Sequence, residues 1–285
     1  MRLLVGFDSS DGGRDALELA RLLATEADGS VTIATVLFSG PLPIDLAGLD
    51  AEEAREAEPV FEEARAVLGE LIVEAHAFGG GSAGAILTGL AERDEFDAIV
   101  VGSPHRGAVG RVLIGNVAGS LLSGAPCDVV VAPKHYAAER GGALRTIAVG
   151  YDGTPESELA LRRAEELARP DNAMLKILTV VAPPVVISGA AGYTPVPPPP
   201  EPDLILNKAL ESVDAKLGAQ GQRLDGAPAS ALVKACEDGT DLLVLGSRGY
   251  GPLSRVLVGS VSRKAAQESP CPVWVVPRPH PGHRD

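Results

Sequence analysis

Glycine and hydroxyl residues gather in one stretch of the C-terminal half, with a spacing that suits the binding of an anion. The stretch begins Gly246-Ser247-Arg248-Gly249-Tyr250-Gly251 and, after seven further residues, continues Gly259-Ser260-Val261-Ser262. Glycines let backbone N–H groups approach a ligand, and a helix N-terminus offers unpaired N–H donors and a favourable dipole. Arg248 adds a positive charge and Ser260 a hydroxyl group. This pattern predicts a cradle for phosphates; a glycine-rich connection without a ligand remains the alternative.

The chain repeats itself at a constant offset of 144 residues. Val5-Gly6-Phe7-Asp8 recurs as Val149-Gly150-Tyr151-Asp152, and eight of the sixteen positions in 102–117 recur in 246–261 without a gap. A period of this length indicates a duplicated domain rather than a solenoid unit of about 20–50 residues. We therefore predict one domain over residues 1–135 and a second over residues 144–278, joined by a polar, glycine-ended linker at Lys134–Gly142.

The first repeat carries only part of the glycine pattern. His105 stands where the second repeat has a glycine, and its side chain would crowd the approach of the backbone to a phosphate. Asn116 stands in place of a serine and is still able to cap a helix. The matching positions, first repeat before second, are Gly102 and Gly246, Pro104 and Arg248, His105 and Gly249, Gly115 and Gly259, Asn116 and Ser260, and Val117 and Val261.

Hydrophobic periodicity predicts alternating strands and helices in both repeats, with Ser10 and Thr154 as equivalent helix N-caps and Pro155 at a first helical position. In the first repeat the predicted strands are 3–7, 31–37, 72–78, 98–101 and 129–132. The first predicted helix follows Ser10 and has apolar residues at helical spacing from Ala16 to Ala24, and the others are 51–68, 83–92 and 116–123. In the second repeat the predicted strands are 146–151, 175–181, a barely visible one at 223–224, 242–245 and 273–276. The first predicted helix follows Thr154 and has apolar residues at helical spacing from Ala160 to Ala168, and the others are 204–217, 229–237 and 260–267.

This alternation, with nearly all-apolar strands, implies an α/β fold in which helices cover both faces of a parallel sheet. Five strands in about 140 residues make a small doubly wound domain, and the chain contains two in tandem. Ligands of such sheets bind beyond the carboxyl ends of the strands. This geometry gathers Asp8, the Thr35-Val36 end and the Gly102 loop at one crevice, and their equivalents at the other.

The spacing Gly246-x2-Gly249-x9-Gly259-Ser260, in a domain whose first strand ends at Asp152, resembles the ATP-binding signature of the universal stress protein family. The resemblance covers both repeats, from about residue 1 to residue 277, and indicates a tandem two-domain member. It implies Rossmann-like domains that bind ATP, with or without Mg²⁺. It also implies a regulatory role in stress or dormancy physiology rather than primarily turnover.

Carried over to this sequence, the resemblance assigns site residues to each repeat. In the second repeat the phosphates and ribose would lie near Gly246, Gly249, Gly259, Ser260 and Val261. The nucleoside would lie near Asp152, and the adenine edge would meet the main chain of Val180. The equivalents in the first repeat are Asp8, Val36, Gly102, Gly115, Asn116 and Val117.

The two repeats differ in net charge. Residues 1–142 hold 22 acidic and 10 basic residues, a net charge of −12, whereas residues 143–285 hold 16 and 15, a net charge of −1. A polyphosphate meets a less repulsive field at the second repeat, although screening beyond about 8 Å limits the effect. Together with the intact glycine pattern, this predicts tighter ATP binding by the second repeat.

Composition excludes several classes of protein. With 45% hydrophobic and 22% charged residues, the 285-residue chain is globular. A net charge of −13 and a pI near 4.9 argue against nucleic acid and anionic membranes as partners. No apolar run approaches the roughly 20 residues that span a bilayer, and the N-terminus lacks a secretory pattern. Three cysteines give no disulfide framework, so we expect a cytoplasmic protein.

Several other motifs are interpreted as structural. Gly80–Gly84 fits the G-x-S-x-G pattern of hydrolases, but the strand before it carries Glu74 and His76 in alternation and is not a buried central strand, so a loop and helix cap is the better interpretation. The five histidines show no metal-ligand spacing. Cys127 and Cys271 are interpreted as small buried apolar groups.

Two features are left open. Cys236 lies on a predicted helix and is either reactive or buried. The prolines at 195–200, with Pro41 and Pro43 at the matching place in the first repeat, form long connections that either cover the crevices, bind a partner or are passive loops.

Three functions follow from the sequence. The first is an ATP-binding regulator. The second is a slow ATP hydrolase or phosphotransferase, for which Asp152 is the only evident candidate base in the second crevice. The third is a nucleotide-free interaction module whose domains associate through the apolar strands at Val129–Val131 and Val273–Val276. Pairing of the two domains within one chain or a homodimer is expected, and the sequence identifies no protein partner.

Overall fold

The computed structural model describes residues 1–37, 51–103, 115–139, 142–182, 201–247 and 260–277, and most of the predicted elements recur in it with small shifts at their ends. The strands of the first half are β1 (Arg2–Gly6), β2 (Ser30–Val36), β3 (Ile72–Phe78), β4 (Ala98–Gly102) and β5 (Asp128–Ala132). Its helices are α1 (Asp11–Glu26), α2 (Ala51–Leu68), α3 (Ala83–Arg93), α4 (Asn116–Leu122) and the short α5 (Tyr136–Glu139), with a 3₁₀ turn at Gly69–Leu71.

The second half repeats the same order of elements. Its strands are β6 (Thr146–Gly150), β7 (Met174–Val181), β8 (Ala219–Asp225), β9 (Leu242–Gly246) and β10 (Val273–Val276). Its helices are α6 (Pro155–Ala168), α7 (Pro202–Ser212), α8 (Pro228–Ala235) and α9 (Ser260–Glu268). None of the helices among the described residues combines the length and the apolar character that crossing a membrane requires.

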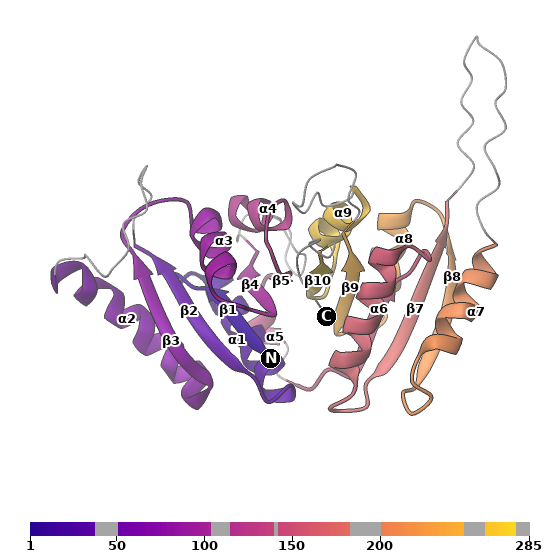
Figure 1. The fold of residues 1–285 in the computed structure, drawn as a ribbon, viewed down its shortest axis with the longest axis horizontal. Helices are drawn as coiled ribbons and strands as arrows, with labels where there is room; N and C mark the ends of the chain where they lie inside the picture. The colour runs from indigo at the N-terminus through magenta and orange to yellow at the C-terminus, as the bar shows by residue number, and fades with distance from the viewer. Residues whose placement is uncertain (38–50, 104–114, 140–141, 183–200, 248–259, 278–285) are drawn as a thin grey trace, which may run out of the picture.

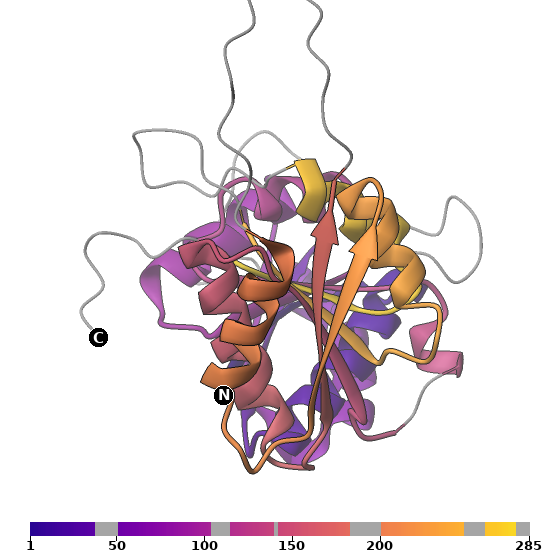
Figure 2. The same ribbon diagram turned by 90° about the vertical axis from the view of Figure 1, so that its right-hand side faces the viewer.

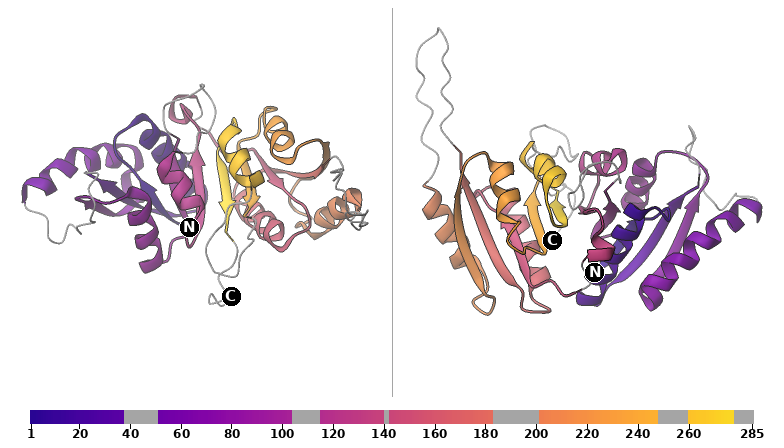
Figure 3. Two further views of the ribbon diagram at one scale, coloured as in Figure 1. Left: turned by 90° about the horizontal axis from the view of Figure 1, so that it is seen from above. Right: turned by 180° about the vertical axis from the view of Figure 1, so that it is seen from behind.

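The strands form one continuous sheet in the order β3-β2-β1-β4-β5-β10-β9-β6-β7-β8 (Figure 1). Within each half all pairings are parallel, and the chain winds outward in both directions from its first strand. This confirms the predicted α/β fold of two doubly wound, five-stranded halves. The halves join through one antiparallel pairing, β5 with β10, which Figure 3 shows at the centre of the molecule.

Helices cover both faces of the sheet, as the all-apolar strands predict. One face packs against α1, α2, α6 and α7, and the other against α3, α4, α8 and α9. Figure 2 shows α7 and α8 on opposite sides of β7 and β8. Each core cluster runs through both halves, so the central strands are buried on both faces.

The predicted N-caps Ser10 and Thr154 are present, whereas Asn116 does not cap α4: it is the first residue of that helix, and Gly115 is the N-cap, without a side-chain hydrogen bond. The Ser10 hydroxyl accepts a hydrogen bond from the Gly13 N–H at 3.1 Å, and the Thr154 hydroxyl accepts one from the Ser157 N–H at 3.3 Å. Pro155 occupies the first position of α6. Its missing N–H costs nothing there, because an N–H at this position has no partner within the helix. Both helices therefore begin where the sequence places them.

Removal of either cap is expected to destabilise the fold modestly. Ser10→Ala or Thr154→Ala leaves an N–H of the first helical turn without its partner, which lowers the free energy of unfolding by about 1 kcal/mol. Urea unfolding followed by circular dichroism measures this. Thr25→Ala is the control, since its hydroxyl bonds only to the Arg21 carbonyl within the same helix. A loss in Thr25→Ala equal to that in Ser10→Ala would contradict the capping role.

Two elements differ from the prediction. Helix α7 covers Pro202–Ser212 rather than 204–217, because the backbone turns extended at Val213 and the Asp214 carboxylate accepts from the Lys216 N–H at 3.0 Å. Strand β8 covers Ala219–Asp225, far beyond 223–224. It is an outermost strand with mostly exposed side chains, so it lacks the apolar pattern by which buried strands are recognised.

The predicted linker is not simply a polar connection. Its described part forms α5, and both Tyr136 and Lys134 are buried. The buried Asp15 carboxylate on α1 accepts hydrogen bonds from the N–H groups of His135 and Ala137, at 2.9 and 3.0 Å. Backbone hydrogen bonds therefore hold this segment against the first half. The polarity of its residues does not predict this packing, because the bonds are made by main-chain N–H groups.

The junction between β5 and β10 contains a buried polar cluster. Val129, Val130 and Val131 pair with Val275, Trp274 and Val273. At the start of β5, the Asp128 carboxylate accepts hydrogen bonds from the Trp274 Nε1–H at 2.6 Å and from the Arg163 guanidinium of α6 at 2.8 Å. Burial raises the pKa of Asp128 to about 6, against the opposing effects of Arg163 and Trp274.

Candidate functional site

The first crevice lies beyond the carboxyl ends of β1, β2 and β4, next to the N-terminus of α4. It is a cavity of about 760 Å³, within the range of roughly 300–1,000 Å³ typical of small-molecule sites. All six residues predicted for this repeat line it, namely Asp8, Val36, Gly102, Gly115, Asn116 and Val117. The tertiary structure therefore brings together residues that are up to 109 positions apart in the sequence.

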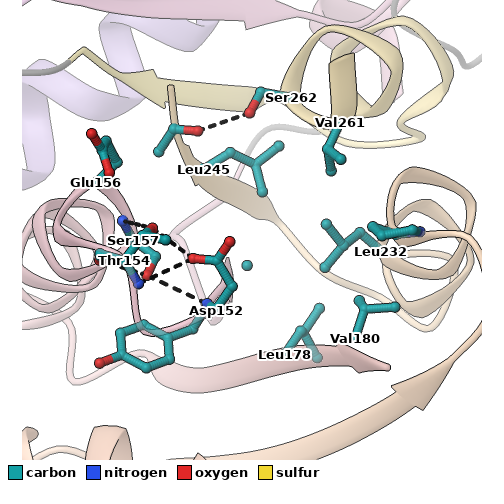
Figure 4. A pocket seen from close by; sticks show the side chains of 14 residues that line it. Asp152, Thr154, Glu156, Ser157, Leu178, Val180, Leu232, Leu245, Val261 and Ser262 are labelled. Carbon is teal, nitrogen blue, oxygen red and sulfur yellow. Dashed lines mark hydrogen bonds between the residues drawn. The ribbon is translucent and has the colours of Figure 1, made fainter. Parts of the chain in front are cut away.

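The second crevice occupies the equivalent place at β6, β7 and β9 (Figure 4). The described residues enclose about 100 Å³ there, and the predicted residues Asp152, Val180, Gly246 and Val261 are among them. Ser260 is the first residue of α9, directly before Val261. The remaining predicted residues, Arg248, Gly249 and Gly259, lie outside the described part of the chain.

An anchored carboxylate stands at the end of the first strand in each half. One oxygen of Asp8 accepts hydrogen bonds from the Ser10 N–H at 3.1 Å and the Ser10 hydroxyl at 2.6 Å. One oxygen of Asp152 accepts the same pair of bonds from Thr154, at 3.2 and 2.6 Å (Figure 4). These bonds fix the direction of each carboxylate, which can then accept hydrogen bonds from a ligand's hydroxyl or amino groups.

Two glycines predicted to approach a phosphate have a second reason for being glycine. A Cβ on Gly102 would overlap the carbonyl oxygen of Gly12, and a Cβ on Gly246 would overlap that of Glu156. The first turns of α1 and α6 therefore rest directly on the ends of β4 and β9. Close helix–strand packing alone requires glycine at these positions, whether or not a ligand is bound.

Sequence reasoning missed several residues of the second crevice. The Ser262 hydroxyl donates to the Gly246 carbonyl at 2.8 Å and ties α9 to the end of β9. The Ser157 hydroxyl accepts from the Asp152 N–H at 3.3 Å. Leu232 and Pro228 of α8 form an apolar wall. The repeat could have identified this wall, because Ala83 and Leu87 hold the same places on α3 and line the first crevice.

The first turns of α1 and α6 differ in charge. Arg14 lines the first crevice and pairs with Glu63 of α2 at 2.6 Å and with Asp11 at 3.2 Å. The Glu63 hydrogen bond raises the pKa of Arg14, and Arg14 in turn lowers the pKa of Glu63. The position equivalent to Arg14 is Glu158, which accepts from the Tyr151 hydroxyl at 2.8 Å. Among the described residues, the first crevice therefore has one basic side chain in its lining beside Asp8 and Asp11, whereas the second has none beside Asp152 and Glu156.

The remaining candidate groups form no second site among the described residues. No cluster of three or more metal-ligating side chains occurs there. His76 contacts Glu74 on the outer strand β3, while His105, His280 and His283 lie outside the described residues, as do the prolines at 195–200.

The surroundings of the three cysteines fit a structural role rather than a reactive one. Cys271 is buried as expected, and Cys127 is partly buried. Cys236, left open by the sequence, is also buried. Burial raises the pKa of Cys127 to about 12, and contact with Cys271 together with burial raises the pKa of Cys236. Such thiols are poor nucleophiles at neutral pH because the thiolate is scarce.

Both halves of the chain match the same protein family. The model described as "Universal stress protein family" matches residues 1–133 and again residues 143–277. Among relatives, universal stress protein Rv2319c of Mycobacterium tuberculosis is 29% identical over 309 residues, covering 97% of this chain and 100% of the relative. A universal stress protein of Mycolicibacterium smegmatis is 30% identical over 298 residues, covering 96% of each chain.

A solved structure shows the same fold over the whole chain. The crystal structure of a universal stress protein from Archaeoglobus fulgidus superposes with a TM-score of 0.68 at 21% identity, covering 97% of this chain and 96% of that chain. The shared architecture therefore includes both halves and not only one repeat.

Proposed function

The chain belongs to the universal stress protein family, and from this premise we propose that it is an ATP-binding regulatory protein of stress or dormancy physiology, with one nucleotide site in each crevice. The observation that carries the proposal is the repeated arrangement at the carboxyl ends of the strands. In each half an anchored carboxylate, Asp8 or Asp152, shares the crevice with the glycine that ends β4 or β9 and with the first residues of α4 or α9.

The described residues fit the parts of ATP. The carboxylates of Asp8 and Asp152 can accept hydrogen bonds from the nucleoside, and the main chain at Val36 and Val180 can meet the adenine edge. Unpaired N–H groups at the start of a helix suit phosphate. The first cavity, at about 760 Å³, has room for a nucleotide. Bound Mg²⁺ would be carried by the phosphates of ATP, since the described residues offer no metal cluster of their own.

We propose that the second crevice binds ATP more tightly. It combines the complete glycine pattern with the half of lower net negative charge. Arg14 at the first crevice acts in the opposite direction, but it is exposed and already paired with two carboxylates. Screening weakens such an exposed charge more than it weakens backbone N–H donors in contact with a phosphate.

Calorimetric titration with ATP tests the proposal. Gly259→Glu places a carboxylate at the second phosphate site and is expected to weaken the tighter binding event at least about 10-fold, which corresponds to about 1.4 kcal/mol. Gly115→Glu is expected to weaken only the weaker event. Gly89→Glu is the matched control, because this glycine lies on α3 with open space around it and outside the crevice.

Each outcome decides a different point. Absence of heat with ATP in the unsubstituted protein would refute nucleotide binding. A larger loss from Gly115→Glu would reverse the order of the two sites. Chromatography of the same sample over hours separates a regulator from an ATP hydrolase or phosphotransferase, because a binding protein leaves ATP intact.

The pairing of β5 with β10 bears on oligomerisation. The two apolar strands that could join separate chains already pair with each other inside one chain. A homodimer, which we retain as a proposal, would therefore use another surface; the outer strands β3 and β8 are the free edges of the described sheet.

A further inference from the structure

The two strands that join the halves pair symmetrically about Val130 of β5 and Trp274 of β10 (Figure 3). These two residues are 144 positions apart, which is the offset of the repeat. The residues on either side also match, since Val129 pairs with Val275 and Val131 with Val273. Two first halves or two second halves from separate chains could therefore pair in the same register. An apolar edge alone does not distinguish the unlike half from a like one.

The side chains at the centre of the junction differ in size. Trp274 is fully buried opposite Val130, and both lie on the face of the sheet that packs against α1 and α6. Two second halves paired in this register would place two Trp274 side chains opposite each other, and two first halves would place two Val130 side chains there. The first arrangement overfills the space that holds one indole and one isopropyl group, and the second leaves it partly empty. Both are unfavourable in a close-packed core.

The polar groups at the junction also come from different halves. The Asp128 carboxylate of the first half accepts from the Trp274 Nε1–H at 2.6 Å and from the Arg163 Nε–H at 2.8 Å, both in the second half. The Arg163 guanidinium carbon lies 5.9 Å from the centre of the Trp274 ring. The Asp128 side chain is 7% exposed and that of Arg163 25%. A carboxylate buried to this degree depends on its donors, because an unpaired buried charge is strongly unfavourable.

The equivalent positions of the repeat lack these groups. Leu19 of the first half stands where the second half has Arg163, and Pro272 of the second half stands where the first half has Asp128. Two first halves would therefore bury Asp128 against leucine and valine, with neither donor. Two second halves would place Arg163 against proline and leave it only its exposed partner, Glu166. The polar contacts at the junction form only between unlike halves.

A contact on the opposite face of the sheet has the same property. The Arg263 guanidinium of α9 donates to the Ser123 hydroxyl at the end of α4, at 3.1 Å. The equivalent of Arg263 in the first half is Gly119, and the equivalent of Ser123 in the second half is Gln267. A pair of first halves would lack the arginine, and a pair of second halves would lack the serine. The preference for unlike halves therefore extends to both faces of the sheet.

We propose that the junction is a recognition surface whose fitting partner is the other half of this chain, and that Asp128, Arg163 and Trp274 make it selective. A buried ion pair adds little net stability compared with apolar side chains of similar size, so selectivity is the better explanation of its position. Closure of the junction within one chain then excludes the association of chains through like halves. This selectivity concerns assembly and does not depend on nucleotide binding.

Charge reversal in the full chain tests the selectivity. Asp128→Arg places two guanidinium groups at the junction of one chain, and Arg163→Asp places two carboxylates there. Each variant is expected to open its junction, seen as a shift to longer wavelength in the fluorescence of Trp274, the only tryptophan of the chain. The variant with both reversals in one chain is expected to close again, because it restores one charge of each sign.

Mixing of the two single variants distinguishes recognition from loss of stability alone. Each chain then finds a complementary half only on the other variant. Affinity capture of a tagged Asp128→Arg chain, after the samples are refolded together from urea, is expected to retain at least about 10-fold more untagged Arg163→Asp chain than untagged Asp128→Arg chain. The second sample controls for association through any other surface. Refolding together keeps the test valid where one variant does not fold alone.

Equal retention of the two untagged chains would overturn the proposal. It would also be overturned by single variants whose Trp274 emission matches that of Glu166→Gln, the control that removes only the exposed partner of Arg163. The result is separate from the titration with ATP, since Asp128 and Arg163 are not among the residues that line the two crevices. Failure of nucleotide binding would leave this selectivity intact, and the reverse also holds.

Discussion

Asp128→Ala is expected to lower the free energy of unfolding by about 3 kcal/mol or more, because removing one partner of a buried ion pair leaves the other charge uncompensated. The Asp128 carboxylate, 5% exposed, is the shared acceptor for Arg163 and for Trp274. Its loss removes the acceptor of the Trp274 Nε1–H and of the Arg163 Nε–H at the junction of the two halves. Urea unfolding followed by Trp274 fluorescence reports directly on this place.

Glu166→Gln is the control for this prediction. Glu166 is the other partner of Arg163, at 2.6 Å, but its side chain is 52% exposed. Exposed pairs contribute about 0–1 kcal/mol, so the variant should unfold almost as the unsubstituted protein does. An equal loss in the two variants would mean that burial of Asp128 does not determine its importance. At about pH 4 the difference between Asp128→Ala and the unsubstituted protein should grow, since the pKa of Asp128 is raised from 3.8 to about 6 in the folded protein and a raised pKa contributes most stability at low pH.

Gly102→Ala is expected to lower the free energy of unfolding by about 3 kcal/mol, at the upper end of what overpacking costs. The added methyl group would overlap the Gly12 carbonyl oxygen, and backbone atoms cannot move aside by changing rotamer. Relief requires α1 to shift away from the end of β4. Far-UV circular dichroism in urea measures the loss.

Two other glycines calibrate this effect. At Gly6 a Cβ would lie 2.9 Å from a Leu87 methyl group, the flexible end of a side chain, so Gly6→Ala should destabilise by only about 1 kcal/mol. At Gly89, within α3, nothing lies within 4 Å, and Gly89→Ala should stabilise by about 0.5–1 kcal/mol. If Gly102→Ala is no worse than Gly6→Ala, the close helix–strand contact does not constrain this position.

The sequence predicted the buried elements well, because their burial leaves a local pattern. Strand β10 and helix α2 have the predicted boundaries, and the caps Ser10 and Thr154 make the predicted bonds. Apolar residues recur with the period of the element they belong to, and caps lie next to the helix they begin. Strand β8 failed this test because an exposed outer strand needs no apolar face.

Residues of the candidate site could be predicted where both repeats carry the same residue at the same place. Asp8 and Asp152 stand at equivalent strand ends, and the structure places each in a crevice with its glycine partner. Ser262 was not identified, because its bond to the Gly246 carbonyl closes a loop whose geometry no spacing rule describes. The sequence suggests that Gly102 is a glycine because a ligand approaches it. The structure gives a sufficient reason without a ligand, since a Cβ on Gly102 would overlap the backbone of Gly12.

By itself, the sequence determined the two-fold repetition and the α/β class, and it indicated the strand ends at which we propose that a ligand binds. All of these depend on periodicity or on residues near one another along the chain. Only the tertiary structure decided that β5 and β10 pair within one chain, that Asp128 binds Arg163 and Trp274, and that Glu26 accepts a hydrogen bond from the Leu144 N–H. The side-chain contacts among these join polar groups 35 to 146 residues apart, and they leave no periodic trace in the sequence because each depends on isolated partners far along the chain.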